Sequence, residues 1–282
     1  MIEMIVTDLD GTLLNRNKEL SDYNRDVLIR AQEDGLVLVL ATGRNVYTLE
    51  GLVAQLKMAD FKSGYLIGVN GLQLYEFESD SYHKAEPLSE GEVERIHCLL
   101  NENDYSVFYF SDEKTVCGYN FLMKVALKIG FLKRKIRRII ASSAAVEIEY
   151  VPNGKVALAS QNKICFIAFN PYKLQKIKRE LNRDFTLLQV GRHWVEIIPK
   201  NVSKARRLET IVAKKGLGLD RVAIFGDSEN DVDMLRLGPH GYVPANGLVQ
   251  AKKVAREIIP SNNENGVGKT VARLLKENKN MR

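Results

Sequence analysis

The sequence is poor in the residues that mark disulfide-rich proteins and zinc proteins. It has three cysteines among 282 residues, Cys98, Cys117 and Cys165, and no CxxC pair. This argues against a zinc knuckle or a disulfide framework, so we expect free thiols in a reducing compartment. The four histidines are scattered and lack the HExxH spacing of a zinc hydrolase.

Long apolar runs are also missing. No run approaches the roughly 20 residues that a membrane helix needs. At the N-terminus, Glu3, Asp8 and Asp10 interrupt any stretch that could serve as a secretory signal. We therefore expect a cytoplasmic protein with no membrane contact. The remaining composition, with 45% apolar and 27% charged residues, is that of an ordinary globular chain with ample material for a core.

Short apolar runs alternate with amphipathic segments near both ends of the chain. The runs at 4–7, 36–41, 65–69 and 222–225 have strand length, and helical spacing follows at 21–34, 46–56 and 203–215. Such alternation predicts βαβ units and a parallel sheet. The fold class is therefore α/β, with a doubly wound, Rossmann-like core formed by residues 1–83 and 191–282. In this division the apolar run at 195–198 leads back into the core.

The middle segment, residues 84–190, has a different pattern and predicts an inserted α+β domain. It carries seventeen basic and twelve acidic residues, a net charge of +5. The whole chain has a net charge of +6, so nearly all of the positive excess lies in this segment. Its stretch KVALKIGFLKRKIRR, residues 124–138, predicts an amphipathic helix with a basic face. We favour a solvated face, and a funnel for polyanionic substrates is the alternative. Aromatic residues are sparse there, so we expect no nucleic-acid partner.

Five polar side chains lie shortly after the ends of the expected core strands: Asp8 and Asp10 after the first, Thr42 after the second, and Asp227 and Asp231 after the late one. In open α/β sheets, ligands bind outside the carboxyl ends of the strands, so these side chains should gather in one cleft. Crowded carboxylates repel unless a cation joins them. Oxygen ligands without His or Cys favour Mg²⁺.

Four motifs resemble those of the haloacid dehalogenase-like (HAD) phosphohydrolase superfamily, in the same order. They are DLDGTLL, ATGR, the lysine of PKNVSK, and GDSENDVDML. The pair Asn70-Gly71, the long insertion and the tail ANGLVQAKKVA…SNNENGVG are similar to the Cof-type subfamily, whose inserted domain is a C2-type cap. The resemblance covers the core, about 175 residues. It departs at Asn201, where the family has glycine, and at Val243-Pro244, where Met-Gly is usual.

The resemblance implies a phosphatase with an aspartyl-phosphate intermediate. Asp8 would be the nucleophile, and Asp10 would be first the general acid and then the general base. Thr42 would hydrogen-bond the transferring phosphoryl group. Lys204, which opens an amphipathic helix, would offset the charge of this group and orient Asp8.

The resemblance also implies the ligands of the metal and of the substrate. Mg²⁺ would be held by Asp8, the backbone carbonyl of Asp10, Asp227 and Asp231, the last directly or through a water. The substrate side would include Gly43, Arg44, Asn70 and Asn230. For Arg44 a surface ion pair is an equal alternative, and Asn70 can be a turn residue only. Asn246 and Lys252, in the tail motif, are expected to support the site.

Three functions remain open at this point. The first is a Mg²⁺-dependent phosphatase acting on a small phosphorylated metabolite, such as a sugar phosphate or a nucleotide-like compound. The second is a phosphomutase, which would pass the phosphoryl group to a second hydroxyl. The third is a non-catalytic protein that binds a phosphometabolite. The protein is expected to be a monomer or a homodimer.

Overall fold

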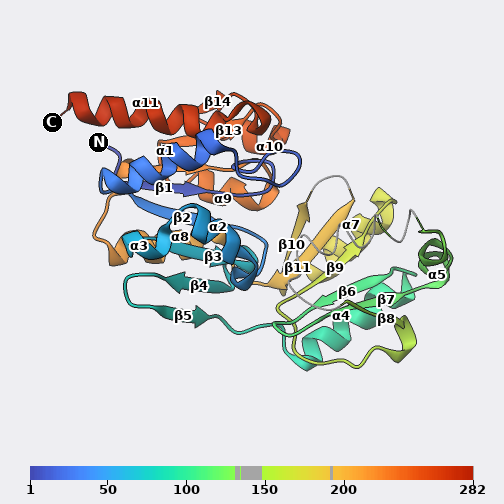
Figure 1. The fold of residues 1–282 in the computed structure, drawn as a ribbon. Helices are drawn as coiled ribbons and strands as arrows, with labels where there is room; N and C mark the ends of the chain where they lie inside the picture. Colours follow the sequence, from blue (N-terminus) through green and yellow to red (C-terminus); the bar gives the residue numbers. More distant parts are fainter. Residues whose placement is uncertain (131–133, 135–147, 191–192, 282) are drawn as a thin grey trace. The chain divides into compact units, whose positions relative to one another are not determined.

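The structure is a computed structural model, and it describes residues 1–130, 134, 148–190 and 193–281. These residues form two compact units (Figure 1). The first unit is Met1–Lys84 with Ser203–Arg282, and the second is Ala85–Val202. Each unit has its own sheet and its own hydrophobic core. Among the described residues, no helix is both long enough and apolar enough to cross a membrane.

The first unit is built on an eight-stranded sheet. The strand order is β14 (Glu257–Ile259), β13 (Gly241–Pro244), β12 (Val222–Phe225), β1 (Met4–Thr7), β2 (Val37–Ala41), β3 (Tyr65–Gly68), β4 (Gln73–Glu76) and β5 (Ser81–Lys84). The strands from β14 to β3 are parallel, and β4 and β5 extend the sheet with antiparallel pairing. Because later strands add on both sides of β1, the sheet is doubly wound, which confirms the predicted fold class.

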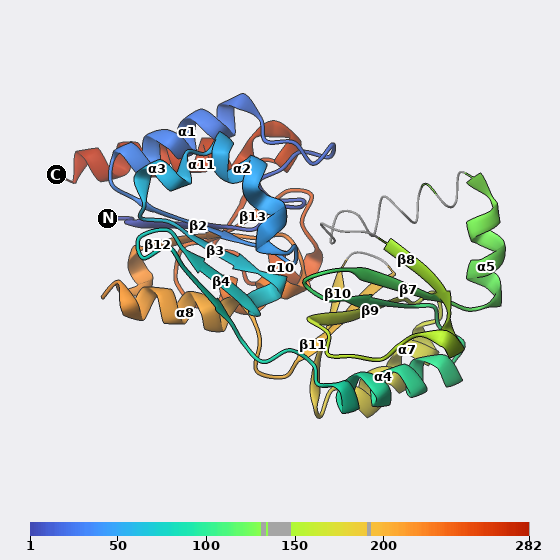
Figure 2. The same cartoon turned by 60° about the horizontal axis from the view of Figure 1, so that its bottom comes forward.

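Helices cover both faces of this sheet (Figure 2). One face carries α1 (Asp22–Glu33), α2 (Glu50–Gln55), α3 (Met58–Phe61) and α11 (Gly266–Asn280). The other face carries α8 (Lys204–Lys214), α9 (Val232–Leu235) and α10 (Val249–Lys252). Residues of β1 divide between the two cores, with Ile5 in one and Met4 and Val6 in the other. This explains why the strand is apolar throughout rather than alternating.

The second unit has a six-stranded sheet. Its order is β10 (Phe185–Val190), β11 (Trp194–Pro199), β9 (Lys163–Ile167), β6 (Val107–Phe110), β7 (Thr115–Tyr119) and β8 (Ile148–Pro152). The helices α4 (Glu90–Glu102) and α7 (Pro171–Leu181) share one hydrophobic core with the sheet. Ser89 is the N-cap of α4 and forms a capping box, in which Ser89 and Glu92 satisfy each other's backbone N–H groups. The short helix α5 (Phe121–Lys128) follows β7.

Short 3₁₀ helices connect several of these elements: η1 (Val46–Leu49), η2 (Val69–Gly71), η3 (Asn153–Lys155), η4 (Leu219–Arg221), η5 (Glu229–Asp231) and η6 (Asn262–Glu264). Two of them bear on function, because η2 follows β3 and η5 carries part of the GDSEND motif.

The second unit ends later than the sequence predicts. The run at 195–198 predicts a strand of the core, but the structure pairs β11 with β10 and β9, so this strand belongs to the second unit. A short apolar run indicates a buried strand without indicating which sheet it joins, and this explains the error. Of the predicted basic helix 124–138, the beginning lies in α5, and residues 131–133 and 135–138 lie outside the described residues.

Candidate active site

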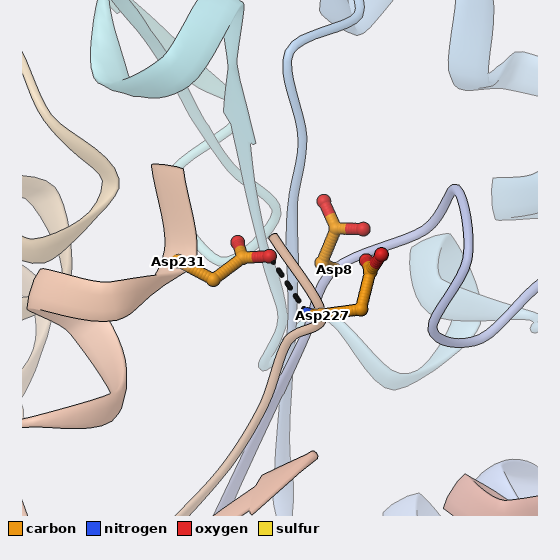
Figure 3. Close-up of side chains that lie close together, drawn as sticks. All are labelled: Asp8, Asp227 and Asp231. Atoms are coloured by element: carbon orange, nitrogen blue, oxygen red, sulfur yellow. Dashed lines mark hydrogen bonds between the residues drawn. The ribbon is translucent and has the colours of Figure 1, made fainter. Parts of the chain in front are cut away.

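Three aspartates meet where β1 and β12 end. Asp8 follows β1, Asp227 follows β12 by two residues, and Asp231 lies one turn further on. The two strands are adjacent and parallel, so their carboxyl ends lie side by side, and Asp8 N–H donates to the Phe225 carbonyl at 2.9 Å. One carboxylate oxygen from each aspartate lies within 4.8 Å of the others (Figure 3). Of the four carboxylates that the sequence predicts to gather, these three do so, and Asp10 is not among them.

Lys204 joins two of these carboxylates. Its Nζ lies 2.5 Å from Asp8 Oδ1 and 2.7 Å from Asp231 Oδ1, and its side chain is fully buried. Lys204 is the first residue of α8, and the Ser203 hydroxyl caps the helix by accepting from Arg206 N–H. The cap fixes where the helix begins, so it also fixes where the lysine enters the site.

Asp231 is held on both of its oxygens. Oδ1 faces Lys204, while Oδ2 accepts from the backbone N–H of Asp227 at 2.9 Å and of Ser228 at 3.0 Å. Figure 3 shows the first of these bonds as a dashed line from Asp227 to Asp231. Because the side chain closes the turn that carries Asp227, Asp231 orders the loop after β12 as well as contributing charge.

The charge of this group is not balanced by Lys204 alone. Burial raises the pKa of Asp8 well above its usual value; Lys204 opposes this effect, and Asp231 and Asp227 add to it. Burial, followed by repulsion from Asp231, raises the pKa of Asp227 to about 7. Burial lowers the pKa of Lys204, but the Asp231 and Asp8 carboxylates outweigh that effect and raise it overall, so the lysine stays charged. Three carboxylates facing one ammonium leave a negative excess that a divalent cation can offset.

The donor set fits a hard cation. The group offers one oxygen each from Asp8, Asp227 and Asp231, and it contains no nitrogen or sulfur donor. Oxygen ligands of this kind suit Mg²⁺, which usually binds one or two carboxylates and keeps water or phosphate oxygens. Gly11, with φ of 90°, is required nearby, because a Cβ there would lie 2.7 Å from Asp227 Oδ2. Thr12 donates its hydroxyl to Asp227 Oδ1 at 2.9 Å.

Asp10 lies outside this group and pairs with Arg44. The guanidinium donates from Nε to Oδ2 at 2.8 Å and from Nη2 to Oδ1 at 2.6 Å, a bidentate geometry. Lys18 Nζ is 3.9 Å from the same carboxylate, and the Asp10 side chain is 39% exposed. Arg44 therefore forms an ion pair whose partner is the predicted general acid, and its contact with the substrate stays a prediction. The sequence motifs did not indicate this pairing.

The other predicted residues meet on the loops after β2, β3 and β12. Thr42 Oγ1 accepts from Arg44 N–H at 3.1 Å. Asn230 Nδ2 donates to Asn70 Oδ1 at 2.8 Å, and the Ser228 hydroxyl donates to Asn230 Oδ1 at 2.6 Å. Gly43 lies against Asn70, because a Cβ at Gly43 would approach Asn70 Oδ1 to 3.2 Å. These contacts bring the predicted substrate side together.

The tail motif supports the turn after Asp8. Asn246 Nδ2 donates to the Gly11 carbonyl at 2.7 Å, and its Oδ1 accepts from Asn262 N–H at 2.9 Å. Asn262 Nδ2 in turn donates to the Leu14 carbonyl at 2.8 Å. Lys252 Nζ donates to the Ala245 carbonyl at 2.6 Å, beside Asn246. The sequence placed Asn246 and Lys252 near the site but gave no role to Asn262, although it lies within the SNNENG stretch.

Comparisons with known proteins agree with this arrangement. The model of the family described as haloacid dehalogenase-like hydrolase matches residues 5–271. The chain is 25% identical to the 5-amino-6-(5-phospho-D-ribitylamino)uracil phosphatase YwtE of Bacillus subtilis, over 97% of this chain and 98% of that protein. It is 26% identical to Phosphatase YwpJ of the same species, over 97% of this chain and 100% of that protein.

A solved structure extends this similarity to the fold. The crystal structure of a haloacid dehalogenase-like hydrolase from Bacteroides thetaiotaomicron aligns with a TM-score of 0.74 and 27% identity, covering 97% of this chain and 100% of that one. The family match extends over most of the chain, and the two Bacillus subtilis relatives are named phosphatases and are matched over nearly their whole length. The chain therefore belongs to the haloacid dehalogenase-like hydrolase family, and it is a phosphatase of that family.

Proposed function

We propose that this phosphatase is Mg²⁺-dependent and hydrolyses a small phosphorylated metabolite through an aspartyl-phosphate intermediate. The observation that carries the proposal is the buried contact of Asp8 with Lys204, inside the three-aspartate group. A carboxylate fixed by a charged lysine and kept from bulk water is suited to attack phosphorus.

In the proposed first step, an Asp8 carboxylate oxygen attacks the phosphorus atom and the bond to the substrate oxygen breaks. Lys204, charged and 2.5 Å from Asp8, orients the attacking carboxylate and offsets charge on the phosphoryl oxygens. Thr42 and Asn230, on the loops after β2 and β12, are the proposed donors to those oxygens. Protonated Asp10 gives its proton to the leaving alcohol.

The contact between Asp10 and Arg44 bears on this proton transfer. The guanidinium occupies both carboxylate oxygens of Asp10, so Asp10 has to exchange one of these two hydrogen bonds for the leaving oxygen. The exposed side of Asp10 leaves room for such a movement. In the second step, Asp10 takes a proton from water, the water oxygen bonds to phosphorus, and the bond to Asp8 breaks. The products are inorganic phosphate and the free Asp8 carboxylate.

The proposed metal ligands are Asp8, Asp227, the backbone carbonyl of Asp10, and Asp231 directly or through a water. Bound Mg²⁺ would stabilise negative charge on the transferring phosphoryl group. The raised pKa values of Asp8 and Asp227 support this assignment, because burial and then repulsion from the neighbouring carboxylates disfavour their charged forms, and a bound cation would offset both effects. Asp231 is already engaged by Lys204 and two backbone N–H groups, so its main part is to hold the loop.

The proposed substrate is a sugar phosphate or a nucleotide-like phosphate. One relative, of 25% identity, is named for a compound that joins a phosphorylated ribityl chain to a uracil ring. Such a compound combines a phosphorylated, sugar-like chain with a nucleobase ring, and these are the features of the two proposed substrate types. The similarity supports the class rather than that single compound, since a second relative of 26% identity is named only as a phosphatase.

The test is phosphate release from a panel of sugar phosphates, nucleotides, cofactor phosphates and p-nitrophenyl phosphate, with Mg²⁺ and with a chelator. We expect release that requires Mg²⁺ and is highest for one chemical class. The Asp8→Asn variant, purified and assayed in the same way, controls for contaminating phosphatases. Release that is equal with chelator would overturn the metal dependence, and transfer to a second hydroxyl without free phosphate would identify a mutase instead.

A further inference from the structure

The turn between β3 and β4 has a backbone conformation that its first residue, Val69, disfavours. Val69, Asn70 and Gly71 are consecutive and have φ values of 47°, 54° and 109°. Glycine adopts this region freely and asparagine tolerates it, but a β-branched valine is an outlier there. Contacts from outside the turn must therefore hold it in this conformation.

Arg207 of α8 supplies such contacts. Its Nε donates to the Gly71 carbonyl at 2.7 Å and its Nη2 donates to the Leu72 carbonyl at 3.2 Å. The turn also lies directly against the start of the helix, because a Cβ on Gly71 would be 2.3 Å from the Ser203 carbonyl oxygen. A planar guanidinium can hold two adjacent carbonyls at once, which a lysine ammonium on a flexible stem does less well.

The Val69–Gly71 turn also holds the loops of the candidate site. Val69 N–H donates to the Arg44 carbonyl and Asn70 N–H donates to the Thr42 carbonyl, both at 2.9 Å. The Asn70 side chain accepts from Asn230 at 2.8 Å. The strained turn therefore joins the loop after β2 to the loop after β12.

Lys204 and Arg207 stand three residues apart on the first turn of α8, so their side chains leave the same face of the helix. Lys204 fixes Asp8 and Asp231, while Arg207 fixes the turn that bears Asn70. One helical turn thus ties together the loops that follow β1, β2, β3 and β12.

We infer that Arg207 is a positioning residue of the active site, acting through the strained Val69–Gly71 turn on Thr42 and Asn230. This inference rests on the proposed function, because it assumes that Thr42 and Asn230 contact the phosphoryl group. Loss of Arg207 lets the turn relax toward ordinary φ values and moves both donors. Donors misplaced by about 1 Å can cost about a hundredfold in rate, so kcat should fall more than KM rises.

The experiment compares Arg207→Met with Arg206→Met, a matched loss of an arginine one residue away. Arg206 is exposed, and among the described residues its hydrogen bonds to Ser203 and Thr210 use only its backbone N–H and carbonyl. With p-nitrophenyl phosphate and Mg²⁺, we expect Arg207→Met to lower kcat by about ten- to a hundredfold with little change in KM. Arg206→Met should keep both constants. Arg207→Lys should fall between Arg207→Met and wild type, because one ammonium replaces a two-pronged donor.

Hydrogen exchange gives a readout that does not depend on turnover. The amides of Val69 and Asn70 should exchange at least about tenfold faster in Arg207→Met, while the amides of the central strands β1 and β12 stay protected. The inference would be overturned if the turn of Arg207→Met exchanged at the wild-type rate, or if its faster exchange were spread evenly over the sheet. Full rescue of kcat by Arg207→Lys would overturn it as well. If the wild type releases no phosphate, the proposed function fails, and the exchange of the turn still decides whether Arg207 holds it.

Discussion

Asp8 and Asp10 are separated by a single residue, Leu9, and have opposite surroundings. Asp8 is buried against Lys204 beside two further carboxylates, whereas Asp10 is 39% exposed and bound by Arg44. The Gly11 turn, with φ of 90°, follows at once and lets the chain leave the sheet. Neighbouring carboxylates in unlike environments are the arrangement expected for one nucleophile and one acid–base group. The comparison shows how two identical side chains acquire different proposed tasks from their contacts alone.

The largest effect should come from removing the buried member of this pair. Asp8→Asn replaces the nucleophile at nearly constant volume, and we expect phosphate release to fall by about 10⁴-fold or more. The fold should survive, because burial already disfavours the charged form of Asp8 and a neutral amide can still accept from Lys204. Steady-state phosphate release and circular dichroism measure the two expectations. Near-normal turnover in a folded variant would disprove the nucleophile assignment.

Removing the exposed member should have a smaller effect that depends on the substrate. For Asp10→Asn we expect a loss of about 10²–10⁴-fold with alkyl phosphates, whose leaving oxygen needs a proton. With p-nitrophenyl phosphate the first step should be largely spared, and slow hydrolysis of the intermediate should produce a burst of p-nitrophenolate. Rapid-mixing kinetics with both substrate types provides the measurement. Equal losses with good and poor leaving groups would contradict the acid–base role.

A still smaller effect should come from the partner of Asp10. In Arg44→Gln the carboxylate loses two hydrogen bonds that limit its orientation, and we expect kcat/KM for an alkyl phosphate to fall about tenfold. Arg44→Lys should recover little of this loss, because one ammonium cannot reproduce the bidentate contact. Should Arg44→Gln match or exceed the wild type, Arg44 restrains Asp10 rather than orienting it.

Much of this site follows from the sequence. The apolar runs predicted the central strands, and the motifs at their ends predicted that Asp8, Asp227, Asp231 and Lys204 meet. Strand order and the parallel arrangement put these residues at one edge of the sheet, so no long-range information was needed beyond the fold class.

The contacts that the sequence did not predict depend on side-chain direction and backbone conformation. Nothing in the motifs indicates that Arg44 turns to Asp10, or that Arg207 reaches two carbonyls of a turn 135 or more residues away. A valine with positive φ is also invisible in sequence, because its intrinsic preference is the opposite. The same holds for β11, whose apolar run fits either sheet equally well.

The smallest effect concerns stability and returns to the negative excess around Asp8. In the metal-free protein, the pKa of Asp227 is about 7 when folded, against an ordinary value of 3.8 when unfolded. Between these values the folded state keeps a proton that the unfolded state has lost. The stability that the folded protein gains by holding this proton is therefore complete below the unfolded pKa of 3.8, and it is lost as pH rises toward about 7.

We expect the melting temperature in chelator to drop by roughly 2–4 °C between mildly acidic and neutral pH. Excess Mg²⁺ should reduce this drop, because a cation bound only by the folded state stabilises it most where the carboxylates are ionised. Thermal unfolding of wild type and Asp227→Asn, each with chelator and with Mg²⁺, tests this directly. Asp227→Asn should show a shallower pH dependence and a weaker response to Mg²⁺. If wild type and variant respond alike, the protonation of Asp227 does not set the pH dependence of stability, and Asp227 is not a ligand through which Mg²⁺ stabilises the folded state.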